Sequence, residues 1–131
     1  MCIFCRIINQ ELPSYRVYED EKTLAFLDIA PVNPGHMLVV PKKHYENMEA
    51  IPEAELKELI IAVKKIGALL KNKLGATGYN IAENNDPSAG QIIPHLHFHL
   101  IPRRAGDGLE LWPQHKYQAG EAEEILKILT S

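Results

Sequence analysis

The most constraining feature of this sequence is the strict alternation over residues 94–102, which read PHLHFHLIP. Imidazole and apolar side chains take turns, the period of two that places successive side chains on opposite faces of a β-strand. As a strand, the segment buries one set of side chains against a helix: Leu96, Phe98 and Leu100. It presents the other set in a row, with neighbours about 6.8 Å apart: His95, His97 and His99. A helix would scatter the imidazoles around its axis, so their alignment depends on the strand prediction.

Three aligned imidazoles have three possible explanations. They are ordinary solvated or hydrogen-bonded histidines, or they bind a catalytic metal ion, or they act in nucleophilic catalysis. Histidines two apart on a strand can share one zinc ion, but three same-face positions span too far to converge easily on a single ion. Neutral imidazole is a good nucleophile near pH 7, and a second histidine can carry the proton that a leaving group needs.

The rest of the chain supplies partners for this strand. Apolar residues recur at spacings of three and four over 53–74, which predicts an amphipathic helix of about six turns. Runs rich in β-branched and aromatic residues predict four further strands: 15–19, 23–28, 36–41 and 78–82. Short terminal helices are expected at 3–9 and 120–129. This order predicts the α+β class, with one long helix on a five-stranded, mostly antiparallel sheet whose other face is free for a ligand.

Composition narrows the function classes. The 131 residues suit a single domain, 1–131, in which 105–131 form a C-terminal tail. A formal net charge of −3 argues against broad capture of DNA or RNA, so no nucleic acid polymer is expected as a partner. No apolar run approaches the roughly 20 residues that span a bilayer, and no leader pattern opens the chain. We therefore expect a cytoplasmic protein without a membrane partner.

The only two cysteines, Cys2 and Cys5, form a C-x-x-C motif. A disulfide scaffold would need more cysteines, and a chain of this length can fold without one. Thioredoxin-like redox pairs usually follow a strand and open a helix. Here the motif precedes every predicted strand, which favours a metal site over a redox pair.

The histidine strand resembles the signature of a known family, the histidine triad (HIT) nucleotide hydrolases and transferases. That signature, His-x-His-x-His followed by two apolar residues, is present at 95–101. Further segments match in the family's order and spacing, so the resemblance extends over 2–104: Cys2-Ile3-Phe4-Cys5, LAFLDI at 24–29, PGHMLVVPKKH at 34–44, Asn84 and Ala89-Gly90-Gln91. One departure is Ile92, where relatives often carry a hydroxyl residue that contacts the phosphate.

The resemblance implies cleavage at the α-phosphate of a purine nucleotide through a nucleotidyl-histidine intermediate. His97 would be the nucleophile, His99 would contact the phosphate and assist proton delivery to the leaving group, and His36 would support them. The remaining nucleotide contacts would be Ile7, Leu12 and Phe26 at the base, Asp28 at the ribose, and Asn84, Gly90 and Gln91 at the phosphate. A nucleotide phosphoramidase is the leading hypothesis. A dinucleoside polyphosphate hydrolase, or a zinc- and nucleotide-binding regulatory protein with little turnover, is the alternative.

The resemblance also implies a structural zinc ion, held by Cys2, Cys5, His44 and His95. Two thiolates and two imidazoles make a closed tetrahedral site of the structural kind. Two free thiols beside unrelated histidines are the alternative. No catalytic metal or organic cofactor is expected. Relatives pair through the long helix and a strand edge, so a homodimer with a ten-stranded sheet is expected here.

Overall fold

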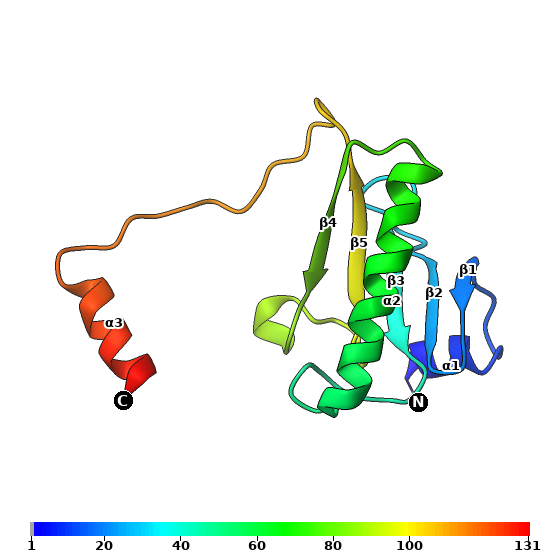
Figure 1. Cartoon of the computed structure of the whole chain (residues 1–131), viewed down its shortest axis with the longest axis horizontal. Helices are drawn as coiled ribbons and strands as arrows, with labels where there is room; N and C mark the ends of the chain where they lie inside the picture. The colour runs from blue at the N-terminus through cyan, green and yellow to red at the C-terminus, as the bar shows by residue number, and fades with distance from the viewer. Residues whose placement is uncertain (1) are drawn as a thin grey trace.

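The computed structural model describes residues 2–131 and confirms the predicted α+β class. One sheet has the strand order β1-β2-β3-β5-β4, and all its neighbouring strands pair antiparallel. A long helix, α2, crosses one face of this sheet (Figure 1). The elements are α1 (Ile3–Ile8), β1 (Arg16–Glu19), β2 (Thr23–Leu27), β3 (Met37–Pro41), α2 (Glu53–Asn72), β4 (Gly78–Glu83), the 3-10 helix η1 (Pro87–Ala89), β5 (Phe98–Arg103) and α3 (Glu121–Thr130).

Helix α2 follows from the apolar spacing that predicted it. Its buried side chains repeat every three or four residues and pack into the main core: Leu59, Ala62, Val63, Ile66 and Leu70. Glutamates at 53 and 55 lie in the first turn and Lys71 in the last, which suits the helix dipole at both ends. The helix ends at Asn72, two residues before the predicted limit, and Gly75 adopts a left-handed φ of 69° just beyond it.

Strand β5 begins at Phe98, four residues later than predicted, because the backbone groups before it bond elsewhere. The ladder between β3 and β5 starts at the Val39–Phe98 pair. Beyond it, the Pro41 carbonyl accepts a hydrogen bond from the His95 side chain at 2.9 Å, and the Leu96 N–H donates to the Tyr45 carbonyl at 2.7 Å. The alternation of side chains nevertheless holds, since Leu96, Phe98 and Leu100 are all buried in the core beneath α2.

The sequence predicted that the second face of the sheet would be free, but α1 packs on part of it. A smaller cluster joins Phe4 of α1 to the sheet residues Leu24, Phe26, Leu38 and Val40. This packing explains why four successive residues of β2, Thr23 to Phe26, are buried: one side meets α2 and the other meets α1. The part of this face beside α1 holds the histidines.

The C-terminal tail leaves the sheet after β5. Every residue from 110 to 131 is exposed, and α3 stands away from the rest of the chain (Figure 1). The large apolar side chains of α3 are exposed to solvent: Ile125, Leu126, Ile128 and Leu129. Among residues 2–131, no helix is long and apolar enough to cross a membrane.

Candidate active site

The fold brings His36, His97 and His99 together at the β3–β5 pair. The ring centroids of His97 and His99 lie 4.9 Å apart, and those of His36 and His99 lie 5.1 Å apart. His36 directly precedes β3, and the register between Leu38 and His99 places its side chain beside β5. All three rings are at least partly buried, and His36 is only 2% exposed. The grouping predicted from sequence is therefore present in the structure.

Hydrogen bonds determine which nitrogen of His97 carries the proton. Its Nδ1 lies 2.7 Å from the main-chain carbonyl of His95, so Nδ1 is the donor. In the neutral ring, Nε2 then carries a lone pair. His97 thus has the tautomer that a nucleophile attacking through Nε2 requires.

His36 imposes the opposite tautomer on His99. The Val32 N–H donates to His36 Nδ1 at 3.1 Å, so the proton of neutral His36 lies on Nε2. That nitrogen is 2.9 Å from His99 Nδ1 and donates to it, which leaves the proton of His99 on its own Nε2. Two adjacent imidazoles therefore present different chemistry through the same ring atom. His97 presents a lone pair, and His99 presents an N–H donor.

Burial keeps the His36–His99 pair neutral. Burial lowers the pKa of His36, opposed by the carboxylate of Asp28, whose Oδ2 lies 3.7 Å from His36 Nε2. The pKa of His99 falls to about 4, mainly because of burial and further because His97 and His36 disfavour a second positive charge nearby. His99 is accordingly a neutral hydrogen-bond donor at neutral pH.

An apolar pocket of about 580 Å³ opens beside these histidines. It contains seven of the residues predicted to contact a nucleotide: Ile7, Leu12, Phe26, Asp28, Gly90, His97 and His99. Sequence reasoning missed other wall residues, among them Ile3, Phe4, Ile29 and Leu38. Ile3 and Phe4 lie four and three positions before Ile7 on a helix, and this spacing could have indicated that they share its face. Ile92, the departure from the family pattern, lies at the rim and is 87% exposed.

Asn84 and Gln91 do not line that pocket. Asn84 borders a second cavity of about 570 Å³, which His36 and His99 also line together with Arg103 and Trp112. The Gln91 side chain instead ties loops together, since its Nε2 donates to the Glu46 carbonyl and its Oε1 accepts from the Asp86 N–H. The backbone N–H groups of Gly90 and Gln91 donate to Pro87 and Asp86 carbonyls. His99 lines both cavities, the first apolar and the second more polar.

Cys2, Cys5, His44 and His95 form a separate cluster whose four donor atoms all lie within 4.8 Å of one another. His95 Nδ1 is 3.4 Å from Cys2 Sγ, 3.6 Å from Cys5 Sγ and 3.1 Å from His44 Nδ1. Metal–sulfur bonds of about 2.3 Å and metal–nitrogen bonds of about 2.0 Å in a tetrahedron imply ligand atoms roughly 3.3–3.8 Å apart. The spacing therefore fits one metal ion.

The protonation of His95 fits the same ion. His95 Nε2 donates to the Pro41 carbonyl, which leaves the Nδ1 lone pair directed at the thiols, the outer-shell arrangement typical of metal-bound histidine. Without a cation, burial and the neighbouring Cys2 raise the pKa of Cys5 to about 11. Asp28, His36 and His99 also lie close together, but His36 Nε2 carries a proton there. Of these two clusters, the one with cysteines has a donor set and spacing that suit a metal ion, and the other presents a proton donor.

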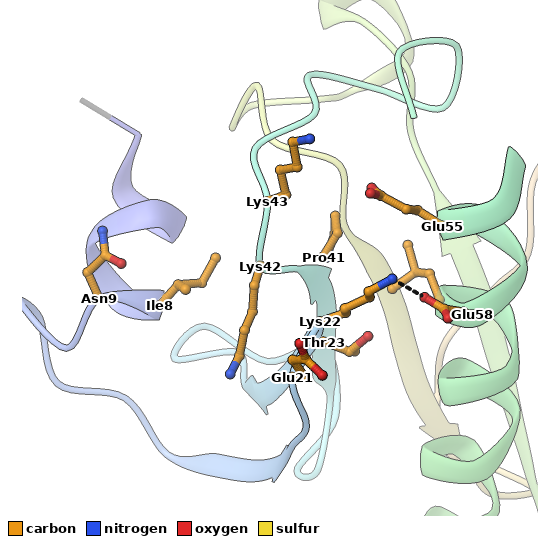
Figure 2. Close-up of a pocket in the computed structure, with 11 residues that line it drawn as sticks. Ile8, Asn9, Glu21, Lys22, Thr23, Pro41, Lys42, Lys43, Glu55 and Glu58 are labelled. Carbon is orange, nitrogen blue, oxygen red and sulfur yellow. Dashed lines mark ion pairs between the residues drawn. The ribbon is translucent and has the colours of Figure 1, made fainter. Parts of the chain in front are cut away.

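A third cavity, of about 460 Å³, lies between α1, the start of β2, the end of β3 and α2 (Figure 2). Its lysines already have partners. Lys22 pairs with Glu58 at 3.2 Å and Lys42 with Glu19 at 2.6 Å, while Lys43 lies over the Tyr45 ring. The charges compensate one another, and no histidine lines this cavity. It is not the site of the predicted chemistry.

Comparison with known proteins identifies the family to which this chain belongs. The family model of the HIT domain matches residues 9–106, and the chain belongs to the HIT-domain family. An uncharacterised HIT-like protein of Methanocaldococcus jannaschii is 54% identical over 127 residues, 97% of each chain. An adenosine 5′-monophosphoramidase of Candida albicans is 42% identical over 118 residues, 86% of this chain and 78% of that protein.

Solved structures agree with the sequence comparison. A HIT-family protein from Bacillus subtilis has a TM-score of 0.87 at 40% identity, over 98% of this chain and 94% of that chain. A zinc-bound histidine triad family protein from Mycobacterium smegmatis has a TM-score of 0.77 at 38% identity, over 88% of this chain and 84% of that chain. The resemblance and the fold predicted from sequence are thereby confirmed.

Lowering the pH should destabilise the protein partly through His99. Its pKa is about 4 when folded and 6.5 when unperturbed, so the unfolded chain binds this proton first and the stabilisation present above pH 6.5 is lost toward pH 4. Urea unfolding at pH 7.5 and pH 5 should show a smaller loss of unfolding free energy in His99→Asn than in the wild type. His115→Asn, an exposed change in the tail, is the matched control and should behave as the wild type. Equal losses in wild type and His99→Asn would contradict the prediction.

Proposed function

We propose that the protein is a nucleotide phosphoramidase that cleaves the phosphorus–nitrogen bond at the α-phosphate of a purine nucleoside 5′-phosphoramidate. The observation that carries this proposal is the pair of complementary tautomers. His97 offers a lone pair and His99 an N–H, both at one end of an apolar pocket large enough for a base. The similarity to a Candida albicans adenosine 5′-monophosphoramidase supports the same substrate class.

Asp28 and the pocket walls would hold the nucleoside. Planar purine rings suit a site walled by Phe26 and by Ile3 and Ile7 of α1. One carboxylate oxygen of Asp28 already accepts from the Ala30 N–H at 2.9 Å. The side chain remains 21% exposed, so its oxygens can also accept hydrogen bonds from ribose hydroxyls.

Reaction would proceed by two displacements at phosphorus. In the first, His97 Nε2 bonds to the α-phosphorus as the bond to the protonated leaving nitrogen breaks, and a neutral amine departs. The positive charge that develops on the His97 ring is stabilised by the His95 carbonyl, which accepts from Nδ1. His99 donates a hydrogen bond from its Nε2–H to a phosphate oxygen and keeps its proton. In the second, water attacks phosphorus, releases a proton to solvent and returns His97 to its neutral form, with a nucleoside monophosphate as product.

A dinucleoside polyphosphate hydrolase is the second candidate, and the cavity on the far side of His99 favours it. That cavity is lined by Asn84, whose amide could donate to a phosphate, and by Trp112, whose ring could stack on a second base. Arg103 also lines it, but its guanidinium is already paired with Asp107 at 2.7 Å. The same nucleophile would serve both reactions, because only the leaving group changes.

We further propose that the cluster of Cys2, Cys5, His44 and His95 holds a structural zinc ion. Its donor set and the hydrogen bond from His95 to Pro41 support this assignment, as does similarity to a zinc-bound relative. When bound, zinc would cross-link the N-terminal segment to the ends of β3 and β5. The catalytic chemistry would not pass through it.

We also propose a homodimer. Strand β4 is an edge of the sheet with half of Ile81 exposed, and α2 leaves Ile60 and Ile61 exposed. Pairing of β4 with a second copy would satisfy its open backbone groups and make a ten-stranded sheet. The unpartnered apolar side chains of α3 fit an assembly as well.

Incubation with adenosine 5′-phosphoramidate should yield AMP, and His97→Ala should lower the rate to the uncatalysed background because the nucleophile is lost. Chromatography resolves the products, and diadenosine polyphosphates tested in parallel distinguish the second candidate. His115→Ala, an exposed change that lines neither cavity, is the control and should retain full activity. Failure of both substrates, or a His97→Ala variant that stays active, would refute the hydrolase proposal. AMP binding without any turnover would favour a regulatory binding protein.

Elemental analysis of the purified protein should find about one zinc ion per chain. Cys5→Ser should lose it, because a neutral hydroxyl replaces a thiolate ligand. Ser88→Ala, remote from the four ligands, is the control and should keep the ion. Absence of zinc together with a reversible Cys2–Cys5 disulfide would support the redox hypothesis instead.

Light scattering at micromolar concentration should report twice the chain mass of 14.8 kDa. Ile81→Lys should lower this mass, because it places a charge at the edge of β4. The matched change Ile29→Lys alters an exposed isoleucine away from that edge and should leave the mass unchanged. A monomeric mass for the wild type would refute the dimer.

A further inference from the structure

Helix α1 is attached to the rest of the chain at both of its ends. It begins directly after Cys2 and carries Cys5 in its first turn, so the Cys2–Cys5–His44–His95 cluster fixes its N-terminus. At the other end, Arg16 donates to the carbonyl groups of Ile7 and Ile8. A helix of six residues is too short to be stable alone, so its position depends on these attachments.

The same helix forms one wall of the nucleotide pocket through Ile3, Phe4 and Ile7. Phe4 is its only buried residue. Its ring packs edge-on against three others, with centroids 5.1 Å from His97, 5.9 Å from His95 and 5.6 Å from Phe26. One side chain therefore contacts a ligand of the proposed metal, the proposed nucleophile and the base wall.

From these contacts we infer that Phe4 is a positioning residue that couples metal binding at the Cys2–Cys5–His44–His95 cluster to nucleotide binding in the adjacent pocket. The inference rests on the proposed function. With the metal bound, the first turn of α1 is held against His95, and Phe4 completes the wall beside His97. Release of the metal frees this turn, so Phe4 loses its fixed contacts and the pocket loses one side.

Such coupling is reciprocal. If the metal tightens nucleotide binding by some factor, the nucleotide must tighten metal binding by the same factor. Calorimetry should therefore find AMP bound at least about fivefold more weakly after a chelator removes zinc. In the reverse experiment, AMP should slow the transfer of zinc from the intact protein to a chromophoric chelator. That second measurement starts from the zinc-loaded protein, so it does not depend on the stability of the zinc-free chain.

Two matched substitutions separate coupling from simple loss of a wall. Phe4→Leu should keep one zinc ion per chain but make AMP affinity and zinc release nearly independent of each other. Leu12→Ala alters a wall residue that lies outside the cluster packed around Phe4, so it should weaken AMP binding yet retain the wild-type coupling factor. A merely structural role for Phe4 would change the two affinities but not the factor that links them.

The outcomes distinguish a failure of the proposed function from a failure of the coupling alone. If AMP does not bind the zinc-loaded protein, the proposed function and the coupling are both wrong. If AMP binds with the same affinity in the presence and absence of zinc, and AMP leaves the rate of zinc release unchanged, only the coupling is wrong. Retention of the full coupling factor in Phe4→Leu would likewise overturn the role assigned to Phe4.

Discussion

The hydrogen bonds of His95 are the interactions on which the rest of this structure depends. Its ring is fully buried and donates to the Pro41 carbonyl, and that bond directs the remaining ring nitrogen toward the two cysteines. Its main-chain carbonyl holds Nδ1 of His97. A buried imidazole must be hydrogen-bonded to be tolerated, and these partners satisfy it while orienting two different centres. The end of β3, the N-terminal helix and the proposed nucleophile are therefore organised around one residue.

Neighbouring backbone groups give three chemically similar side chains different protonation patterns: His36, His95 and His97. The Val32 N–H donates to His36 Nδ1, so the proton of neutral His36 lies on Nε2. The Pro41 carbonyl accepts from His95 Nε2, so the lone pair of His95 lies on Nδ1. Burial reinforces both assignments, because it disfavours the charged imidazolium and keeps His95 and His99 neutral. In the proposed function, the site would meet an anionic substrate with directed hydrogen-bond donors and a lone pair, consistent with the near-neutral charge of the chain.

Much of the fold could be predicted because it follows from short-range periodicity. The apolar spacing before Gly75 placed α2 to within two residues, and the alternation at 96, 98 and 100 identified the side chains beneath it. The start of β5 could not be predicted, since the Pro41 carbonyl and the Leu96 N–H find partners outside the ladder. Helix α1 was expected, but its packing on the second face was not, because a six-residue segment carries too little pattern to specify a distant contact.

The sequence by itself determined the class of chemistry. Strict alternation requires the imidazoles of an extended segment to share a face, and the motifs around it indicate the HIT family. Only the tertiary structure decided which nitrogen of each ring carries a proton, that Gln91 ties loops together while Ile3 and Phe4 wall the pocket, and that Phe4 packs against both His95 and His97. The physical reason is that tautomers and packing depend on contacts between residues far apart in the chain, such as Cys2 and His95, 93 positions apart, which no local pattern encodes.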